Sequence, residues 1–291
     1  MQKFIGTGVA LVTPFKEDLT VDFDALIKLV NFNIENGIKY LVINGTTGES
    51  STITKEEKEQ IIEVIVKTNN KRLPLVLGIG GNNTLEVVNE LKARNLSEID
   101  GILSVAPYYS KPTQEGFYQH FKAIAEATNK PIILYNVPGR TAKNMEPATT
   151  LRLAKDFSNI VAIKEAGNNQ QQYNSLLKDK PAEFLIISGD DDLALGVALA
   201  GGSGVISVIG QAFPKEFSEM IQLGLEGKNI EAYKIHFKMM DIVDYIFAEN
   251  NPAGIKTVLQ ELGICSNIVR LPLVKASTEL QAKIAKYVAD F

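Results

Sequence analysis

A lysine ends one of the most apolar segments of the chain. Lys164 follows the run from Ile160 to Ile163, and Glu165 comes directly after it. A lysine at the end of a buried strand is desolvated, which disfavours its ammonium form. A neutral amine can attack a ketone and form a Schiff base, so Lys164 is a candidate nucleophile. The alternative is a structural lysine that pairs with a neighbouring carboxylate.

A segment rich in glycine and hydroxyl groups is the second candidate. Gly45, Thr46, Thr47 and Gly48 follow an apolar run that ends at Asn44. Glycines let the backbone approach a ligand closely, and N–H and hydroxyl donors suit a carboxylate or a phosphate. The alternative is a glycine-rich turn before a capped helix.

Phenol and guanidinium groups follow two further apolar runs. Tyr135 lies near the end of one run, and Arg140 follows it shortly afterwards. A phenol can carry a proton, and the planar fork of an arginine matches a carboxylate. Arg140 could equally be a surface residue. Tyr108 and Tyr109 follow the other run, and in a loop they could either reach a site or pack on a neighbour.

An acidic run follows Ser188 and Gly189. Asp190, Asp191 and Asp192 raise the hypothesis of a magnesium site. Serine and aspartate are also preferred at helix N-termini, where their oxygens accept from free N–H groups and complement the dipole. We therefore interpret this segment as the start of a helix and expect no metal there.

The composition excludes several classes of protein. The chain has 291 residues, with 30 Lys and Arg against 34 Asp and Glu, a formal net charge of −4. A mildly acidic chain without a basic run is not expected to bind nucleic acid, and no apolar run approaches the ~18 residues of a membrane span. Two histidines, His120 and His236, with one cysteine, Cys265, cannot form a Cys/His zinc site. A lone cysteine cannot form an internal disulfide and fits a reducing compartment, so we expect a cytoplasmic protein.

The candidates follow members of a regular series of apolar runs, which are rich in Val, Ile and Leu like strands covered on both faces. The runs are Gly8–Val12, Tyr40–Asn44, Pro74–Gly78, Gly101–Val105, Pro131–Asn136, Ile160–Lys164, Phe184–Ser188 and Gly204–Val208. Helix signals lie between them, such as the N-cap Asp22 and the capping box of Thr54 and Glu57.

Eight strands alternating with helices predict a (β/α)8 TIM barrel in the α/β class. A doubly wound sheet is the alternative, but no Gly-x-Gly-x-x-Gly follows the first strand. Gly201–Gly204 precedes a strand and not a helix, so it predicts a tight turn. In a barrel the active site lies at the carboxyl ends of the strands, where the candidate residues would meet.

The barrel is expected to occupy residues 1–227. Residues 228–291 are too many for one closing helix and form a C-terminal helical region. We expect helices over Ile230–Phe247, Pro252–Leu262 and Ser277–Phe291. This region would cover a barrel face or provide contacts between subunits.

Taken together, these motifs resemble one family, the pyruvate-dependent class I aldolases of the dihydrodipicolinate synthase and N-acetylneuraminate lyase group. The resemblance runs from Gly6 through at least Phe217. It rests on Gly45–Glu49, Tyr135–Thr141 and Ile163–Glu165. The Thr-Thr pair, Pro107–Tyr109 and the arginine of Pro138–Thr141 favour the dihydrodipicolinate synthase branch, because sialic-acid lyases typically have Ser-Thr and lack this arginine.

The resemblance implies a reaction without metal or organic cofactor. Lys164 would form a Schiff base with pyruvate, which would then condense with L-aspartate 4-semialdehyde. The product would be 4-hydroxy-tetrahydrodipicolinate, in the first committed step of diaminopimelate and L-lysine biosynthesis. Family members are usually homotetramers, dimers of tight dimers.

The resemblance also assigns roles to the other candidates. Thr46 and the Thr47 backbone would hold the carboxylate of pyruvate. Tyr135, Thr47 and Tyr109 would form a proton relay, with Tyr109 supplied by the neighbouring subunit. Arg140 would bind the carboxylate of the semialdehyde and steady Tyr109. Carbonyl groups near Gly189, Asp190 and Ile206 would line the pocket.

Some family members bind lysine as an inhibitor at the dimer interface. The matching positions are Ser50, Ser51, Lys55, Lys58, Asn82, Glu86 and Tyr108. Glu86 could pair with the α-ammonium group of the ligand. Lys55 and Lys58 stand where lysine-sensitive members carry histidines, and two extra cations would weaken binding of a cationic ligand unless they point away. Whether lysine inhibits is left open.

Two other functions fit the same residues less well. One is an aldolase of the same group that cleaves a sugar 2-keto acid. The other is a non-catalytic barrel that senses a small keto acid. The presence of Lys164, both threonines, both candidate tyrosines and Arg140 argues against the sensor.

Overall fold

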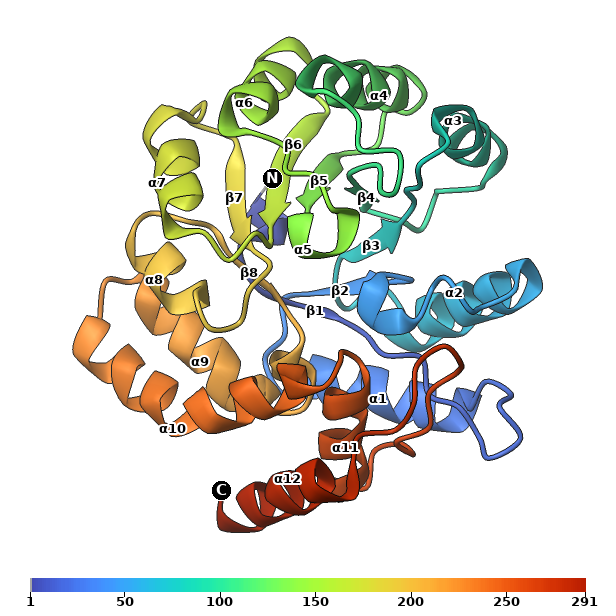
Figure 1. The fold of residues 1–291 in the computed structure, drawn as a ribbon, viewed down its shortest axis with the longest axis vertical. Coiled ribbons are helices and arrows are strands. Elements are labelled where there is room, and N and C mark those ends of the chain that lie inside the picture. Colours follow the sequence, from blue (N-terminus) through green and yellow to red (C-terminus); the bar gives the residue numbers. More distant parts are fainter. Residues whose placement is uncertain (1) are drawn as a thin grey trace.

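The chain forms a closed barrel of eight parallel strands in the order β1 to β8, with β8 paired to β1. The computed structural model describes residues 2–291. Figure 1 shows the helices arranged around the strands. The strands are β1 (Gly6–Ala10), β2 (Tyr40–Ile43), β3 (Leu75–Gly78), β4 (Gly101–Val105), β5 (Ile132–Asn136), β6 (Ile160–Glu165), β7 (Leu185–Ser188) and β8 (Gly204–Ser207). The predicted (β/α)8 barrel is confirmed.

Helices follow the strands. Within the barrel they are α1 (Phe23–Glu35), α2 (Lys55–Asn69), α3 (Thr84–Ala93), α4 (Gln114–Glu126), α5 (Pro138–Thr141), α6 (Pro147–Asp156), α7 (Gln170–Asp179), α8 (Ala194–Leu199) and α9 (Pro214–Leu225). Short 3-10 helices are η1 (Gln2–Phe4), η2 (Thr46–Gly48) and η3 (Ile209–Gln211). Asp22 caps α1 by accepting from the Ala25 N–H at 3.0 Å, and the capping box of Thr54 and Glu57 starts α2, as predicted.

The first strand begins earlier than predicted. It spans Gly6–Ala10 and not Gly8–Val12, because Gly6 pairs with Gly204 of β8 where the barrel closes. Beyond its end, the Val12 N–H donates to the Gln211 side chain at 2.9 Å and not to a strand. The other predicted strands agree with the structure to within one residue at each end.

Two layers of apolar side chains hold the barrel. The inner layer fills the lumen, and it includes Phe4 from η1, packed edge-on against Tyr40 with ring centroids 5.8 Å apart. Gly8 faces this ring, and a Cβ there would lie 2.2 Å from it, so only glycine fits. The outer layer lies between the strands and the surrounding helices. Burying a side chain such as Leu41 completely contributes roughly 1.5–3 kcal/mol.

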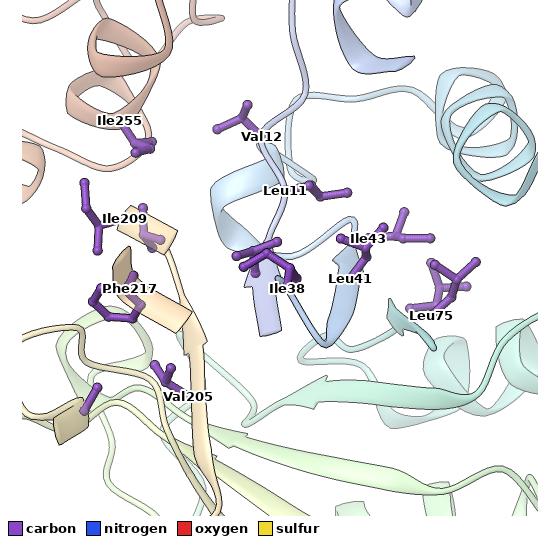
Figure 2. Packing of buried hydrophobic residues seen from close by; sticks show 14 of the residues in the cluster. Leu11, Val12, Ile38, Leu41, Ile43, Leu75, Val205, Ile209, Phe217 and Ile255 are labelled. Atoms are coloured by element: carbon purple, nitrogen blue, oxygen red, sulfur yellow. The ribbon is translucent and has the colours of Figure 1, made fainter. Parts of the chain in front are cut away.

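The last part of the chain shares this outer layer. It comprises α10 (Asn229–Ala248), α11 (Ala253–Glu261) and α12 (Thr278–Asp290), close to the predicted helices. Ile255 of α11 belongs to the same cluster as Val12 and Ile209, and Figure 2 shows the three on facing segments. In Figure 1 these helices extend along one side of the barrel, from α9 to α1. No helix within residues 2–291 combines the length and the apolar character needed to cross a membrane.

Candidate active site

A cleft of about 720 Å³ opens at the carboxyl ends of the strands. It brings together most of the predicted site residues, although they come from four different strand ends. The lining includes Thr46, Thr47, Tyr135, Arg140, Lys164, Gly189 and Asp190. Ile206 is fully buried in the lumen layer, in one apolar cluster with Tyr135. The cleft is also lined by α10 and the segment after it, which the sequence did not predict.

Lys164 and Tyr135 occupy paired positions on adjacent strands. The register of β5 and β6 places them side by side, and the Lys164 Nζ lies 4.5 Å from the centre of the Tyr135 ring. Lys164 is 5% exposed and has no ion pair within 4.0 Å among residues 2–291. The structural lysine paired with a carboxylate is therefore not what the structure contains. A positive charge on this nitrogen is attracted to the ring by roughly 0.5–2 kcal/mol.

Gly189 has no side chain, and this leaves room for the side chain of Lys164. A Cβ at Gly189 would lie 2.9 Å from the Lys164 Cε and 2.6 Å from the Ala166 Cβ. The backbone after β7 therefore approaches the lysine as closely as a residue without a side chain allows.

The threonine pair lies on the short helix η2 after β2. Residues on both sides, Asn44 and Glu49, have a φ of 55°, so the chain turns sharply at each end. The Gly48 carbonyl accepts a hydrogen bond from the Thr13 Oγ1 at 2.7 Å. Thr47 is 3% exposed, and its Oγ1 accepts from the Asn251 Nδ2 at 3.0 Å. No direct hydrogen bond joins Thr47 to Tyr135 in the described chain.

A buried ion pair holds the same turn from the other side. The Lys256 Nζ lies 2.5 Å from the Glu49 Oε1, and both side chains are essentially inaccessible to solvent. Lys256 also donates to the Ile268 carbonyl at 2.7 Å, and the Arg270 N–H donates to the Glu49 Oε2 at 2.9 Å. Burial lowers the pKa of Lys256, whereas the charge of Glu49 raises it. The C-terminal region thus fixes the turn that carries Thr46 and Thr47.

Glu165 points away from Lys164 into a network of amides. Its carboxylate accepts from the Asn136 Nδ2 at 3.0 Å and from the Gln172 Nε2 at 2.8 Å. Asn144 joins the two amides. Burial raises the pKa of Glu165 to about 7, although the amide donors lower it. The sequence analysis did not identify this network, because its members are far apart in the chain.

The acidic run after β7 does not start a helix, so our interpretation of it was wrong. Helix α8 begins at Ala194, and its N-terminus has no side-chain cap. Asp191 instead accepts from the Val208 and Ile209 N–H groups, each at 3.0 Å, and Asp190 accepts from the Asn168 N–H at 2.9 Å. The acids hold neighbouring loops at the mouth. Burial raises the pKa of Asp190 to about 6.

Arg140 and Tyr109 lie at different places. Arg140 lies on α5, directly after β5, and lines the cleft. Tyr109 is 87% exposed, has a φ of 68° and does not line the cleft of its own chain. Its neighbour Tyr108 is also exposed, and the Tyr108 carbonyl accepts from the Asn82 Nδ2 at 3.3 Å.

The residues matched to a lysine site do not gather in one place. Lys55, Lys58 and Glu86 line one cleft of about 780 Å³ between α2 and α3. Ser50 lines a smaller pocket of about 100 Å³ that Lys58 shares. Asn82 and Tyr108 are joined by the hydrogen bond described above, and Ser51 is exposed after η2.

The histidines and the cysteine lie away from Lys164: His236 is half-buried on α10, in a pocket that Asp191, Asp192 and Asp244 also line. His120 is buried on α4 and shares a hydrogen bond of 2.8 Å with the Thr84 hydroxyl, and burial lowers its pKa to about 4. Cys265 is buried, which raises the pKa of its thiol to about 12. Within residues 2–291 no three His, Cys, Asp or Glu side chains gather closely enough to hold a metal ion.

Known proteins resemble this chain over its whole length. A sequence model of the dihydrodipicolinate synthetase family matches residues 3–290. A 4-hydroxy-tetrahydrodipicolinate synthase from Flavobacterium psychrophilum is 58% identical, over 98% of this chain and 97% of its own.

Solved structures resemble it equally well. A chloride-inhibited dihydrodipicolinate synthase from Acinetobacter baumannii, solved with pyruvate, is 39% identical with a TM-score of 0.95, over 99% of this chain and 98% of that one. A protein described as the first monomeric dihydrodipicolinate synthase variant is 37% identical with a TM-score of 0.94, over 99% and 97%.

A closed barrel with a buried lysine at its mouth agrees with these relatives, and the chain is an enzyme of the lyase class. It belongs to the dihydrodipicolinate synthetase family. The family resemblance noted in the sequence is thereby confirmed.

Proposed function

We propose that the chain condenses pyruvate with L-aspartate 4-semialdehyde through a Schiff base on Lys164. The product is 4-hydroxy-tetrahydrodipicolinate, in the first committed step of diaminopimelate and L-lysine biosynthesis. One observation carries this proposal: a buried lysine without an ion pair lies against Tyr135 in a cleft that Thr46, Thr47 and Arg140 share.

The first steps take place at Lys164. Its neutral amine attacks the ketone carbon of pyruvate, and loss of water leaves an iminium ion. The iminium withdraws electrons, so the methyl group of pyruvate loses a proton and an enamine forms. The Tyr135 ring lies under the nitrogen that carries the positive charge, which stabilises the iminium. No metal or organic cofactor takes part in these reaction steps.

Two carboxylate sites would orient the substrates. Thr46 and the backbone of Thr47 hold the carboxylate of pyruvate, supported by their place on the tightly held turn η2. Arg140 binds the carboxylate of the semialdehyde. Asp190 and Asp244 line the same cleft and offer negative charge to the α-ammonium group of that substrate. A cleft with both signs of charge suits a zwitterionic amino-acid aldehyde.

The enamine carbon then attacks the aldehyde, whose oxygen takes up a proton. Tyr135, Thr47 and the partner subunit's Tyr109 would relay protons in both transfers. The amino group of the adduct finally attacks the iminium carbon, closes the ring and releases Lys164. Carbonyl groups near Gly189, Asp190 and Ile206 would line the pocket.

The exposure of Tyr109 supports an assembly of at least two copies, since this phenol cannot reach the cleft of its own chain as folded. We propose a homotetramer made of two tight dimers. The barrel of residues 1–227 carries the chemistry, and the helical region of residues 228–291 supports it. A cytoplasmic location agrees with the single, buried thiol.

The site around Lys55, Lys58 and Glu86 is proposed as the place where lysine would act. Two cations in this cleft oppose a cationic ligand. Activity that does not respond to millimolar lysine would show that the site does not serve inhibition.

Borohydride reduction in the presence of pyruvate tests the proposal. Intact mass should show one covalent adduct, and digestion should place it on Lys164. Lys164→Ala should trap nothing. A parent chain without an adduct, or a variant that still traps, would refute the Schiff base. A strong preference for a sugar aldehyde over aspartate semialdehyde would instead favour the sugar 2-keto acid aldolase.

A further inference from the structure

Asn251 connects the C-terminal region directly to Thr47. It follows α10 and precedes α11, and its Nδ2 donates to the Thr47 Oγ1 at 3.0 Å, between two buried side chains. We propose that Asn251 is a positioning residue that sets the direction in which the Thr47 hydroxyl donates its proton. This inference rests on the relay role proposed above for Thr47.

The hydrogen-bonding chemistry of the two groups carries the argument. A hydroxyl has one hydrogen to donate and two lone pairs that accept. The amide NH₂ of Asn251 only donates, so it occupies a lone pair of the Thr47 oxygen. The Thr47 hydrogen must therefore point away from Asn251. No hydrogen bond donated by this hydroxyl is present in the described chain, so its hydrogen is available to the substrate or to a tyrosine of the relay.

The position of Asn251 is fixed by its surroundings. The Gly254 Cα lies so close to α10 that a Cβ there would be 2.4 Å from the Ile246 carbonyl oxygen. Two residues further along α11, Lys256 forms the buried ion pair with Glu49, which lies two residues after Thr47. The same ion pair thus holds both ends of the hydrogen bond between Asn251 and Thr47, and the amide cannot follow a displaced hydroxyl.

The other end of the amide is unused within the chain. The Asn251 Oδ1 is buried and has no hydrogen-bond partner among residues 2–291. An unpaired buried acceptor is unfavourable, because it has lost its hydrogen bonds to water without gaining a partner. This oxygen has almost no accessible surface, although other atoms of Asn251 line the cleft, so the amide keeps its NH₂ on Thr47 while its oxygen stays unpaired.

Asn251→Asp is the sharpest test, because an ionised carboxylate has nearly the same shape and can only accept. It would take the Thr47 hydrogen and reverse the direction of the bond. Asn251→Ala removes the partner and leaves the hydroxyl free to rotate. Asn174→Asp is the matched control, since it introduces the same charge on the exposed face of α7, where the side chain does not line the cleft.

Three measurements separate positioning from a structural role. Deuterium exchange at the pyruvate methyl group, followed by NMR, reports proton transfer after the Schiff base forms. Borohydride trapping reports the Schiff base itself, and the melting temperature reports the fold. We expect Asn251→Asp to slow exchange and kcat by about 10- to 100-fold, which is less than or equal to the lower end of the roughly 10²- to 10⁴-fold that a positioned proton carrier contributes. Trapping should stay within about twofold of the parent.

The pH profile gives a readout that a packing defect would not produce. At low pH the introduced carboxyl of Asn251→Asp is protonated and can donate again. Its exchange rate relative to the parent should therefore rise as the pH falls, whereas Asn174→Asp should keep a constant ratio near one.

Exchange by Asn251→Asp within about twofold of the parent, or an equal loss of exchange and trapping at all pH values, would overturn the inference. If this variant does not fold, Asn251→Ala decides: at least about fivefold slower exchange with unchanged trapping supports positioning, and unchanged exchange refutes it. A parent chain that forms no pyruvate adduct would refute the proposed function itself, whatever the Asn251 variants show.

Discussion

Removing Lys256 should destabilise the protein and disturb its active site together. Lys256→Met keeps the length of the side chain but leaves the Glu49 carboxylate buried without its cation. Of the donors that residues 2–291 offer to that carboxylate, the Arg270 N–H, at 2.9 Å, would remain. Glu49 lies at the end of η2, so the turn that carries Thr46 and Thr47 would shift or loosen.

The structure sets the size of the effect. The charged atoms lie 2.5 Å apart, and neither side chain is accessible to water. Removing one member of such a pair costs about 3–5 kcal/mol, because the remaining charge loses its partner and cannot be hydrated. Glu49→Gln should cost less, because Lys256 keeps the Ile268 carbonyl at 2.7 Å and the Phe15 ring at 4.2 Å. The double variant should be more stable than Lys256→Met alone, since no unpaired charge is buried.

Urea unfolding followed by circular dichroism measures all four proteins. The coupling free energy from this double-mutant cycle should exceed about 1 kcal/mol, as for residues in direct contact. Pyruvate titration of the folded Lys256→Met variant should show weaker binding. A loss below about 1 kcal/mol for this variant, or additive single effects, would refute the reasoning.

Three further predictions concern the site. Gly189→Ala should lower trapping of pyruvate at least about tenfold, because its Cβ would lie 2.9 Å from the Lys164 Cε, whereas Gly196→Ala, with nothing within 4 Å, should trap normally. Burial raises the pKa of Glu165 from 4.5 to about 7, so the free energy that its protonated form adds to folding is fully present below pH 4.5 and is lost as the pH rises through 7. In Glu165→Gln the free energy of unfolding should therefore fall less over this pH range. Identical pH profiles of unfolding for the parent and the variant would contradict this. Tyr109→Phe should lower turnover more than adduct formation, and an equal loss of both would indicate a defect of folding or assembly instead.

Local sequence signals predicted the elements that depend on local physics. Strands that are buried on both faces appear in the sequence as apolar runs. The side chains of Asp22 and Thr54 cap helices by accepting from N–H groups only three residues away. The start of β1 was misplaced because its first residues pair with β8, almost 200 residues later, and no local pattern reports barrel closure.

The candidate site shows the same difference between local signals and long-range contacts. Lys164, Tyr135, Arg140 and the threonine pair were identifiable, because each follows a strand and the barrel topology brings the strand ends together. The roles of Asp190 and Asp191 were missed because their N–H partners belong to other loops. Asn251, Lys256 and Arg270 gave no signal either, since their partners lie about 200 residues earlier in the chain. A lysine in an apolar helix such as α11 was the only available hint.

The buried pair of Glu49 and Lys256 also imposes an order on synthesis. Glu49 leaves the ribosome about 200 residues before its cation, and a growing chain that has completed all eight strands still lacks Lys256 and Asn251. Until α11 emerges, the segment around Thr47 has an acid that favours water over the interior. The nascent barrel therefore carries Lys164, the proposed nucleophile, early but fixes the turn proposed to bind a carboxylate only when its last fifth is made. On the proposed mechanism, catalytic competence arrives at the end of translation.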